Sequence, residues 1–137
     1  MGRIAGARLS LDTAPVIYTV EQVAPFAAAT DLRLSGPDIE LVASDLTRLE
    51  CRVKPLRDGN ADLLQDFDNY FTNACTTIIG LTTEVIDKAT EIWAIYGFRT
   101  PDAIHLAAAI LANSDVFLTN DRRLDRFTEL VVEAIRV

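Results

Sequence analysis

The chain has 137 residues, 50% of them hydrophobic and 24% charged, which is typical of one globular domain with a core of ordinary size. No apolar run reaches the ~18–20 residues of a membrane span, and the N-terminal stretch lacks the apolar segment of a signal peptide, so we expect a cytoplasmic protein without membrane contact. The net charge of −7 argues against a protein that coats nucleic acid by bulk electrostatics, and Cys51 and Cys75 suggest neither a disulfide framework nor a zinc site.

Short apolar runs alternate with helical patterns along the chain. The first half predicts a strand at 8–11, a helix over 14–29 that Pro25 interrupts, a turn at 35–38, a strand at 39–43, and a helix from the N-cap Ser44 to about Val53 that Lys54-Pro55 ends. The second half predicts a loop at 57–60, helices at 61–72, 83–96 (ended by Gly97) and 100–112, and strands at 76–81, 115–119 and 130–135. This alternation predicts an α/β fold whose sheet of about five strands is mainly parallel and covered on both faces.

Two acids follow predicted strands directly. Asp12 comes after the first strand, and Asp121 comes after the fourth, in DVFLTND. Taken alone, each acid is better explained as a turn or cap residue. In parallel sheets, however, ligands bind at the carboxyl ends of the strands, so both acids are candidates for one site.

A third acid, Glu50, lies on a predicted helix. Leu46, Leu49 and Val53 form an apolar stripe that we expect to face the core, and helical spacing places Glu50 on that stripe. A glutamate there either reaches solvent along the stripe, forms a salt bridge, or serves as a ligand beside Asp12.

The fourth acid, Asp102, begins an alanine-rich helix that is apolar on nearly every side and should therefore be buried all round. Thr100 is the expected N-cap and Pro101 suits the first helical position, so an acid that complements the helix dipole is one explanation. Four carboxylates converging on one edge cannot all stay ionised without a counter-charge, and a hard divalent cation supplies one.

The sequence resembles the PIN-domain ribonucleases, specifically the VapC-like toxins of toxin–antitoxin pairs. The matching stretches, in the family's order, are LDTAPVIY (11–18), SDLTRLECRVKPLRDGN (44–60), RTPDAIHLAAA (99–109) and DVFLTNDRRL (115–124). The resemblance implies a single PIN-like domain over residues 1–137, folded as a three-layer α/β/α sandwich. It implies that Mg²⁺ or Mn²⁺ is held by the catalytic acids Asp12, Glu50, Asp102 and Asp121, with Thr119 as a further catalytic residue beside the last acid.

The function implied by this resemblance is metal-dependent hydrolysis of RNA phosphodiester bonds by a homodimer that binds a small cognate antitoxin. Many relatives carry Asn or Ser at the position of Ala14, so one polar contact near the metal is missing here. The alternative is a catalytically silent PIN-fold interaction module, which the complete set of acids argues against. A phosphatase usually needs a second acid two residues after its nucleophilic aspartate, and Ala14 disfavours that reading.

Basic and aromatic residues add further expectations. The candidates for binding RNA phosphates are Arg48, Arg52, Lys54, Arg57, Arg122, Arg123 and Arg126, which could instead form a solvated face or pair with Asp58, Asp62 and Asp125. His105, the only histidine, is expected to be a core residue that donates to a backbone carbonyl. Trp93 and Tyr96 are expected in the core or at a dimer contact, and an apolar surplus at Phe67, Tyr70, Phe71 and Trp93 supports the dimer.

Overall fold

The structure is a computed structural model that describes residues 7–137; the first six residues, part of the N-terminal stretch considered above for a signal peptide, lie outside the described residues. Its centre is one sheet of five strands in the order β3-β2-β1-β4-β5, and every strand pair is parallel. The strands are β1 (Arg8–Leu11), β2 (Glu40–Ser44), β3 (Thr77–Ile79), β4 (Val116–Thr119) and β5 (Val131–Ala134). The prediction of a mainly parallel sheet of about five strands is therefore confirmed.

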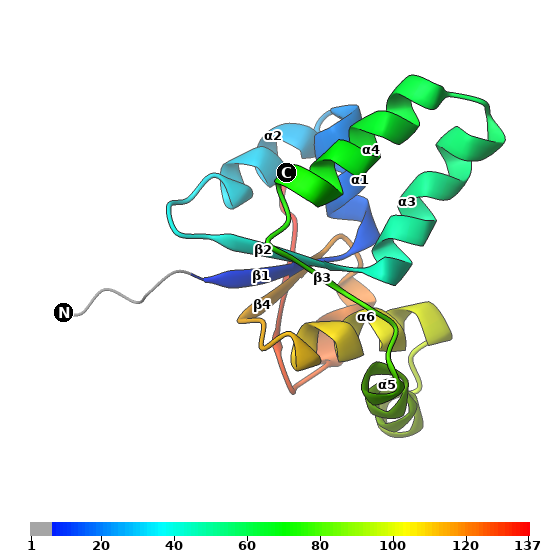
Figure 1. The fold of residues 1–137 in the computed structure, drawn as a ribbon. Helices are drawn as coiled ribbons and strands as arrows, with labels where there is room; N and C mark the ends of the chain where they lie inside the picture. Colours follow the sequence, from blue (N-terminus) through cyan, green and yellow to red (C-terminus); the bar gives the residue numbers. More distant parts are fainter. Residues whose placement is uncertain (1–6) are drawn as a thin grey trace.

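Helices cover both faces of the sheet, which gives three layers (Figure 1). One face carries α1 (Thr13–Glu21), α2 (Phe26–Leu34), α3 (Asp45–Arg57) and α4 (Ala61–Asn73), and the other carries α5 (Thr83–Tyr96) and α6 (Thr100–Leu111). A short 3-10 helix, η1 (Arg122–Arg126), connects β4 to β5. Among residues 7–137, no helix combines the length and the hydropathy that crossing a membrane requires.

Each face of the sheet has its own hydrophobic core. Phe67 of α4 packs with Leu11 and Leu118 on the first face, and Phe117 packs with Leu106 of α6 on the second. Phe67 is fully buried and Phe71 is 4% exposed, so the expectation that these two aromatic residues supply an exposed apolar surplus is wrong. They face the sheet because they lie four residues apart, on the same side of α4.

Proline acts differently at two positions in the chain. Pro25 separates α1 from α2, as predicted. Pro55, by contrast, lies inside α3, which continues to Arg57, so the predicted end of this helix at Lys54-Pro55 is wrong. Pro55 is buried against the core, and the N–H of Asp58 bonds the Lys54 carbonyl just beyond it (2.9 Å). The helix thus continues past Pro55 with its ring buried, although a proline cannot donate a helical hydrogen bond.

Candidate active site

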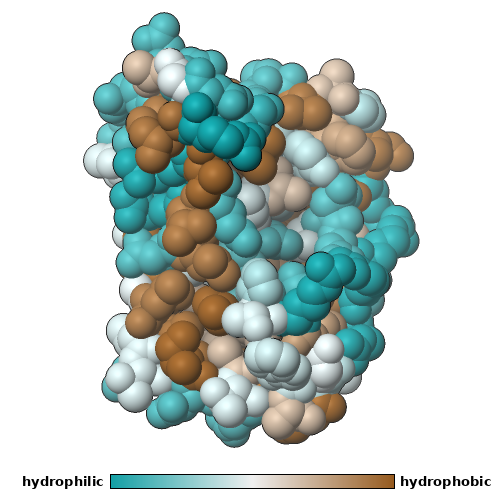
Figure 2. Space-filling view, turned by 90° about the vertical axis from the view of Figure 1, so that its right-hand side faces the viewer, coloured by the Kyte–Doolittle hydropathy of each residue, from teal (hydrophilic) through white to brown (hydrophobic). Residues whose placement is uncertain are grey.

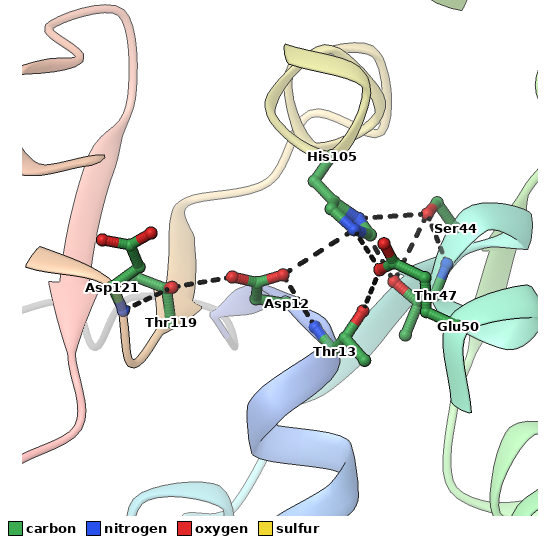
Figure 3. Close-up of polar contacts among 8 residues, drawn as sticks. All are labelled: Asp12, Thr13, Ser44, Thr47, Glu50, His105, Thr119 and Asp121. Carbon is green, nitrogen blue, oxygen red and sulfur yellow. Dashed lines mark hydrogen bonds and ion pairs between the residues drawn. The ribbon is translucent and has the colours of Figure 1, made fainter. Parts of the chain in front are cut away.

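Asp12 lies at the carboxyl end of β1, where the chain turns into α1. Its Oδ1 accepts the Thr13 N–H (2.8 Å) and caps α1, while its Oδ2 accepts the Thr119 hydroxyl (2.7 Å). Thr119 is the last residue of β4, is fully buried, and also accepts the Asp121 N–H (3.0 Å). Figure 3 shows this chain of contacts, which fixes the carboxyl ends of β1 and β4 to each other.

Glu50 reaches the same edge from α3 and meets His105 of α6 (Figure 3). His105 Nε2 lies 2.8 Å from Glu50 Oε1 and 3.7 Å from Asp12 Oδ1, and the Thr13 hydroxyl donates to Glu50 Oε1 (2.5 Å). The hydrogen bond from His105 is the main reason that the pKa of Glu50 lies below its usual value, although burial opposes it. The prediction that His105 donates to a backbone carbonyl is therefore wrong, since its ring bonds a carboxylate.

The other nitrogen of His105 faces two hydroxyl groups. Nδ1 lies 3.3 Å from Thr47 Oγ1 and 3.5 Å from Ser44 Oγ, and all three residues are buried. A carboxylate can only accept, so Nε2 carries the hydrogen toward Glu50, and in a neutral ring Nδ1 accepts from a hydroxyl. Ser44 also caps α3 by accepting the Thr47 N–H (3.2 Å), as its predicted N-cap role requires.

The face of α3 that meets the core differs from the predicted one. Leu49 and Val53 are 56% and 48% exposed, whereas Thr47 and Cys51 are buried. The spacing of three and four residues is the same for a core-facing stripe and for an exposed stripe, so the pattern alone does not identify the buried side. Glu50 lies between the two faces, half-buried, and enters the site from the flank of the helix.

Asp102 is half-buried in the first turn of α6. The N-cap is Arg99, whose carbonyl accepts the Ala103 N–H (2.9 Å), and not Thr100 as predicted; Thr100 is already helical. The pKa of Asp102 is raised by burial and then by the negative charges of Asp12 and Asp121. Within residues 7–137, no hydrogen bond reaches the Asp102 carboxyl group, which leaves its charge the least compensated of the four acids.

Asp121 is the N-cap of η1 and forms a two-pronged ion pair with Arg123. Arg123 Nη2 lies 2.5 Å from Asp121 Oδ2, and Arg123 Nε lies 2.9 Å from Oδ1. Hydrogen bonding by this side chain lowers the pKa of Asp121, and the charge of nearby Arg99 adds to the effect. Arg99 was not expected from the sequence, although it stands in the matched stretch RTPDAIHLAAA, one turn before Asp102.

The four acids bring hard oxygen donors to one edge of the sheet, the chemistry that Mg²⁺ and Mn²⁺ prefer. Within residues 7–137, no three acidic, histidine or cysteine side chains stand close enough together to hold a metal ion as they are oriented. Protein donors occupy one oxygen of Glu50 and both oxygens of Asp12 and Asp121. A cation bound by all four acids would therefore share or replace some of these bonds.

Most of the predicted RNA-binding cations on α3 already have partners. Arg48 pairs with Asp45 (3.2 Å), Arg52 with Asp68 (2.9 Å) and Arg57 with Asp58 (3.6 Å), so intramolecular pairing holds for these three arginines. In the described part of the chain, neither Lys54 nor Arg122 forms an ion pair, and the expected pairs with Asp62 and Asp125 are absent. Arg126 instead donates to the Tyr96 carbonyl and lies over the Phe98 ring.

Known proteins share this architecture. A structure of VapBC2 from Rickettsia felis, bound to a promoter DNA fragment, is similar with a TM-score of 0.74 at 16% identity, over 94% of this chain and 99% of that one. A toxin–antitoxin complex from Klebsiella pneumoniae gives 0.75 at 18% identity over 94% and 99%. VapC20 from Mycobacterium tuberculosis, described as a toxin that cleaves the sarcin–ricin loop, gives 0.69 at 12% identity over 90% and 98%.

At these low identities, the TM-scores show a shared fold alone. No curated protein matches the chain by sequence. The model of the PIN domain family, however, matches residues 10–130, which is most of the chain. The chain therefore belongs to the PIN domain family.

Proposed function

We propose that this protein is a metal-dependent endoribonuclease and the toxin of a toxin–antitoxin pair, acting in the cytoplasm as a single PIN-like domain. One observation carries the proposal. Asp12, Glu50, Asp102 and Asp121 come from four separate elements to the carboxyl edge of one parallel sheet. There Asp102 is half-buried, lacks a hydrogen-bond donor among the described residues, and is repelled by Asp12 and Asp121.

A divalent cation, Mg²⁺ or Mn²⁺, fits these carboxylates by charge and by donor type. When bound, such an ion makes a water molecule more acidic and neutralises charge on a phosphate group. Asp12, Glu50, Asp102 and Asp121 would hold it. Asp102 has the strongest reason to bind, because burial and then repulsion by Asp12 and Asp121 raise the pKa of its carboxyl group, and a cation would offset both effects.

The neighbours of these acids orient them. Thr119 holds Asp12 Oδ2 and the Asp121 N–H at once, so it sets the spacing between two ligands from different strands. His105 and Thr13 both donate to Oε1 of Glu50, which leaves Oε2 to face a ligand. Bonds of this kind hold metal ligands in a defined orientation.

The substrate we propose is RNA, held by cations around the acidic edge. Arg99 and Arg123 lie within the electrostatic reach of Asp121, and Lys54 and Arg122 have no ion pair in the described part of the chain. Phosphate contacts of this kind position a nucleic acid without reading its sequence. The net charge of −7 does not oppose such binding, because a metal held by the acids presents a positive centre.

The direct test is cleavage of a mixed single-stranded RNA by the purified chain. We expect cleavage with Mn²⁺ or Mg²⁺, none with EDTA, and a large loss with Asp12→Asn, since asparagine preserves the cap on α1 but removes a charged ligand. Cleavage that is unaffected by EDTA, or by Asp12→Asn in a protein free of contaminating nuclease, would refute the proposal.

The partner we propose is a small antitoxin. The support is the similarity in fold to chains of toxin–antitoxin complexes, including VapBC-1 from nontypeable Haemophilus influenzae (TM-score 0.73, 18% identity). Co-expression with the product of the adjacent reading frame tests this directly. We expect the two proteins to co-purify and the RNA cleavage to be suppressed, and failure to co-purify would count against this partner.

A homodimer is the second assembly we propose, and an exposed hydrophobic surface supports it. Leu49, Val53 and Leu56 of α3 are 56%, 48% and 67% exposed, and Ile86 and Trp93 of α5 are 44% and 54% exposed. Figure 2 views the side of the molecule on which α3 and α5 lie, and hydrophobic surface crosses it as a band, here called the α3–α5 band.

The α3–α5 band exposes enough apolar surface for a dimer interface of standard size. Its five side chains together expose on the order of 500 Å². A standard interface buries about 800 Å² on each partner, and somewhat more than half of that area is apolar. The exposed apolar area of the band is therefore similar to the apolar area of one such interface. Large exposed apolar patches commonly mark such contacts. Light scattering at micromolar concentration tests the proposal, and a clean monomer over that range would contradict it.

The alternative of a catalytically silent interaction module also has one observation in its favour. Among residues 7–137, no three potential ligands are arranged to hold a metal ion as they stand. Thermal denaturation with and without Mn²⁺ separates the two functions. A nuclease should gain stability from the ion, whereas a silent module should show no gain.

A further inference from the structure

Among residues 7–137, Arg123 is the arginine whose side chain directly contacts one of the four acids. Asp121 Oδ1 accepts both the backbone N–H of Arg123 (3.0 Å) and its Nε (2.9 Å), and Oδ2 accepts Nη2 (2.5 Å) and Nε (3.2 Å). The guanidinium group therefore covers both carboxylate oxygens. Only one of these four contacts, from the backbone N–H to Oδ1, would remain if the side chain moved away.

Burial differs sharply between the two partners. The Arg123 side chain is 68% exposed, whereas that of Asp121 is 27% exposed and belongs to the end of the sheet. Arg123 can thus leave Asp121 without opening the core, and its departure would free Oδ2 completely. The positive charge of Arg123 also acts on Asp102, where it opposes the rise in pKa, so the same guanidinium partly compensates two of the four acids.

We propose that Arg123 exchanges partners during the reaction, an inference that rests on the function proposed above. Before metal binds, Arg123 neutralises Asp121. With a divalent cation held by the acids, Arg123 would leave Oδ2 of Asp121, and its released guanidinium group would then bind two oxygens of an RNA phosphate. Carboxylate and phosphate offer a guanidinium the same two-pronged geometry, so the exchange costs little rearrangement.

The exchange gives Arg123 two effects of opposite sign. It competes with the metal for Asp121 and so weakens metal binding, and it contacts the substrate and so strengthens RNA binding. A residue that simply held Asp121 in position would strengthen metal binding instead. The sign of the change in metal affinity on removing Arg123 therefore separates the two roles.

Arg99 provides a matched control. It is a second arginine whose charge acts on Asp121, and it makes no hydrogen bond to that carboxylate in the described structure. Arg99→Ala removes the same unit of nearby positive charge without removing a direct competitor. An effect of charge alone would raise the Mn²⁺ affinity of both variants, whereas direct competition would raise it mainly in Arg123→Ala.

The experiment is calorimetric titration of Mn²⁺ into the full chain and its variants, followed by RNA cleavage at saturating Mn²⁺. We expect Arg123→Ala to bind Mn²⁺ several-fold more tightly than the unmodified chain and Arg99→Ala to change affinity clearly less. We also expect Arg123→Ala to raise KM for RNA about threefold to tenfold while kcat changes little. Arg123→Gln, which keeps a long polar side chain, should behave in the same way and guards against a disturbed η1.

Equal or weaker Mn²⁺ binding by both Arg123 variants would overturn the exchange while leaving the proposed nuclease intact. An unchanged KM would overturn it as well, because the exchange requires the released guanidinium to reach the substrate. An unmodified chain that binds no Mn²⁺ and cleaves no RNA would overturn the proposed function and the exchange together.

Discussion

Replacing Asp102 with asparagine tests the electrostatics of the site most simply. The side chain keeps its size and polarity but loses the negative charge that Asp12 and Asp121 repel. Without metal, we expect the Asp102→Asn protein to be more stable than the unmodified chain at pH 7. With metal, we expect the variant to bind Mn²⁺ more weakly and to cleave RNA poorly.

Two opposing terms set the size of the stability change. Burial of the charged carboxylate and repulsion from two partly screened carboxylates, at an effective dielectric constant well above that of a dry interior, are together worth about 1–2 kcal/mol. Loss of an acid from the first turn of α6 costs about 0.3–1 kcal/mol through the helix dipole. The net gain should lie between about zero and 1.7 kcal/mol, and its midpoint of about 0.8 kcal/mol corresponds to roughly 2–4 °C in Tm for a domain of this length.

The pH dependence has a defined sign. The fold raises the pKa of Asp102 above its ordinary value of 3.8, so this group favours the folded state at low pH, and that contribution is lost as pH rises through the raised pKa. Asparagine does not titrate. The gain in stability should therefore be present at pH 7 and disappear as the pH falls toward 3.8.

The assay is thermal denaturation in EDTA at several pH values, followed by RNA cleavage with Mn²⁺. An Asp102→Asn protein that is less stable at pH 7 and cleaves RNA at the normal rate would refute this reasoning. That result would mean that Asp102 serves only as a complement to the helix dipole.

Three further changes test other parts of the structure. His105→Ala should lower the free energy of unfolding by about 2–3 kcal/mol, because it breaks a partly buried hydrogen bond to the Glu50 carboxylate. Since the fold lowers the pKa of Glu50, the loss should shrink as pH falls below 4.5, and equal losses in urea at pH 7 and pH 4 would contradict this. Leu56→Glu should give a monomer by light scattering, whereas Leu32→Glu, at a 77% exposed position of α2, should leave the dimer intact. Phe67→Ala should cost about 3–5 kcal/mol in a thermal melt, and a loss under about 1 kcal/mol would contradict its full burial.

The strands were predictable because buried parallel strands are short apolar runs between turn signals. The predicted strand at 8–11 is β1 itself, and the helix predicted at 83–96 is α5 with its Gly97 cap. The end of α3 was not predictable from Pro55, because burial of that ring and the bonds beyond it are tertiary and capping effects. The rule that a proline ends a helix considers only neighbouring residues in the sequence. At Pro55 the packing of the folded chain, which the rule does not consider, lets the helix continue.

The acids of the candidate site could be placed on one edge from the sequence because parallel strands end on the same side. The hydrogen bonds among these acids and their neighbours could not be predicted from the sequence. The approach of His105 to Glu50 depends on how α6 packs beside α3, and a lone histidine on an apolar helix has the same sequence pattern in either role. The surroundings of Glu50 were also not predictable from the sequence pattern. Its helix buries Thr47 and Cys51, and not the predicted apolar stripe that included Leu49 and Val53.

The central claim is that the four carboxylates share a divalent cation, and anomalous diffraction from crystals grown with Mn²⁺ tests it most directly. We predict one strong manganese peak, or two close peaks, at the carboxyl edge of the sheet, with oxygens of Asp12 and Asp102 at about 2.0–2.3 Å and Arg123 withdrawn from Asp121. No peak at this edge under saturating Mn²⁺, with Asp121 still paired to Arg123, would contradict the account.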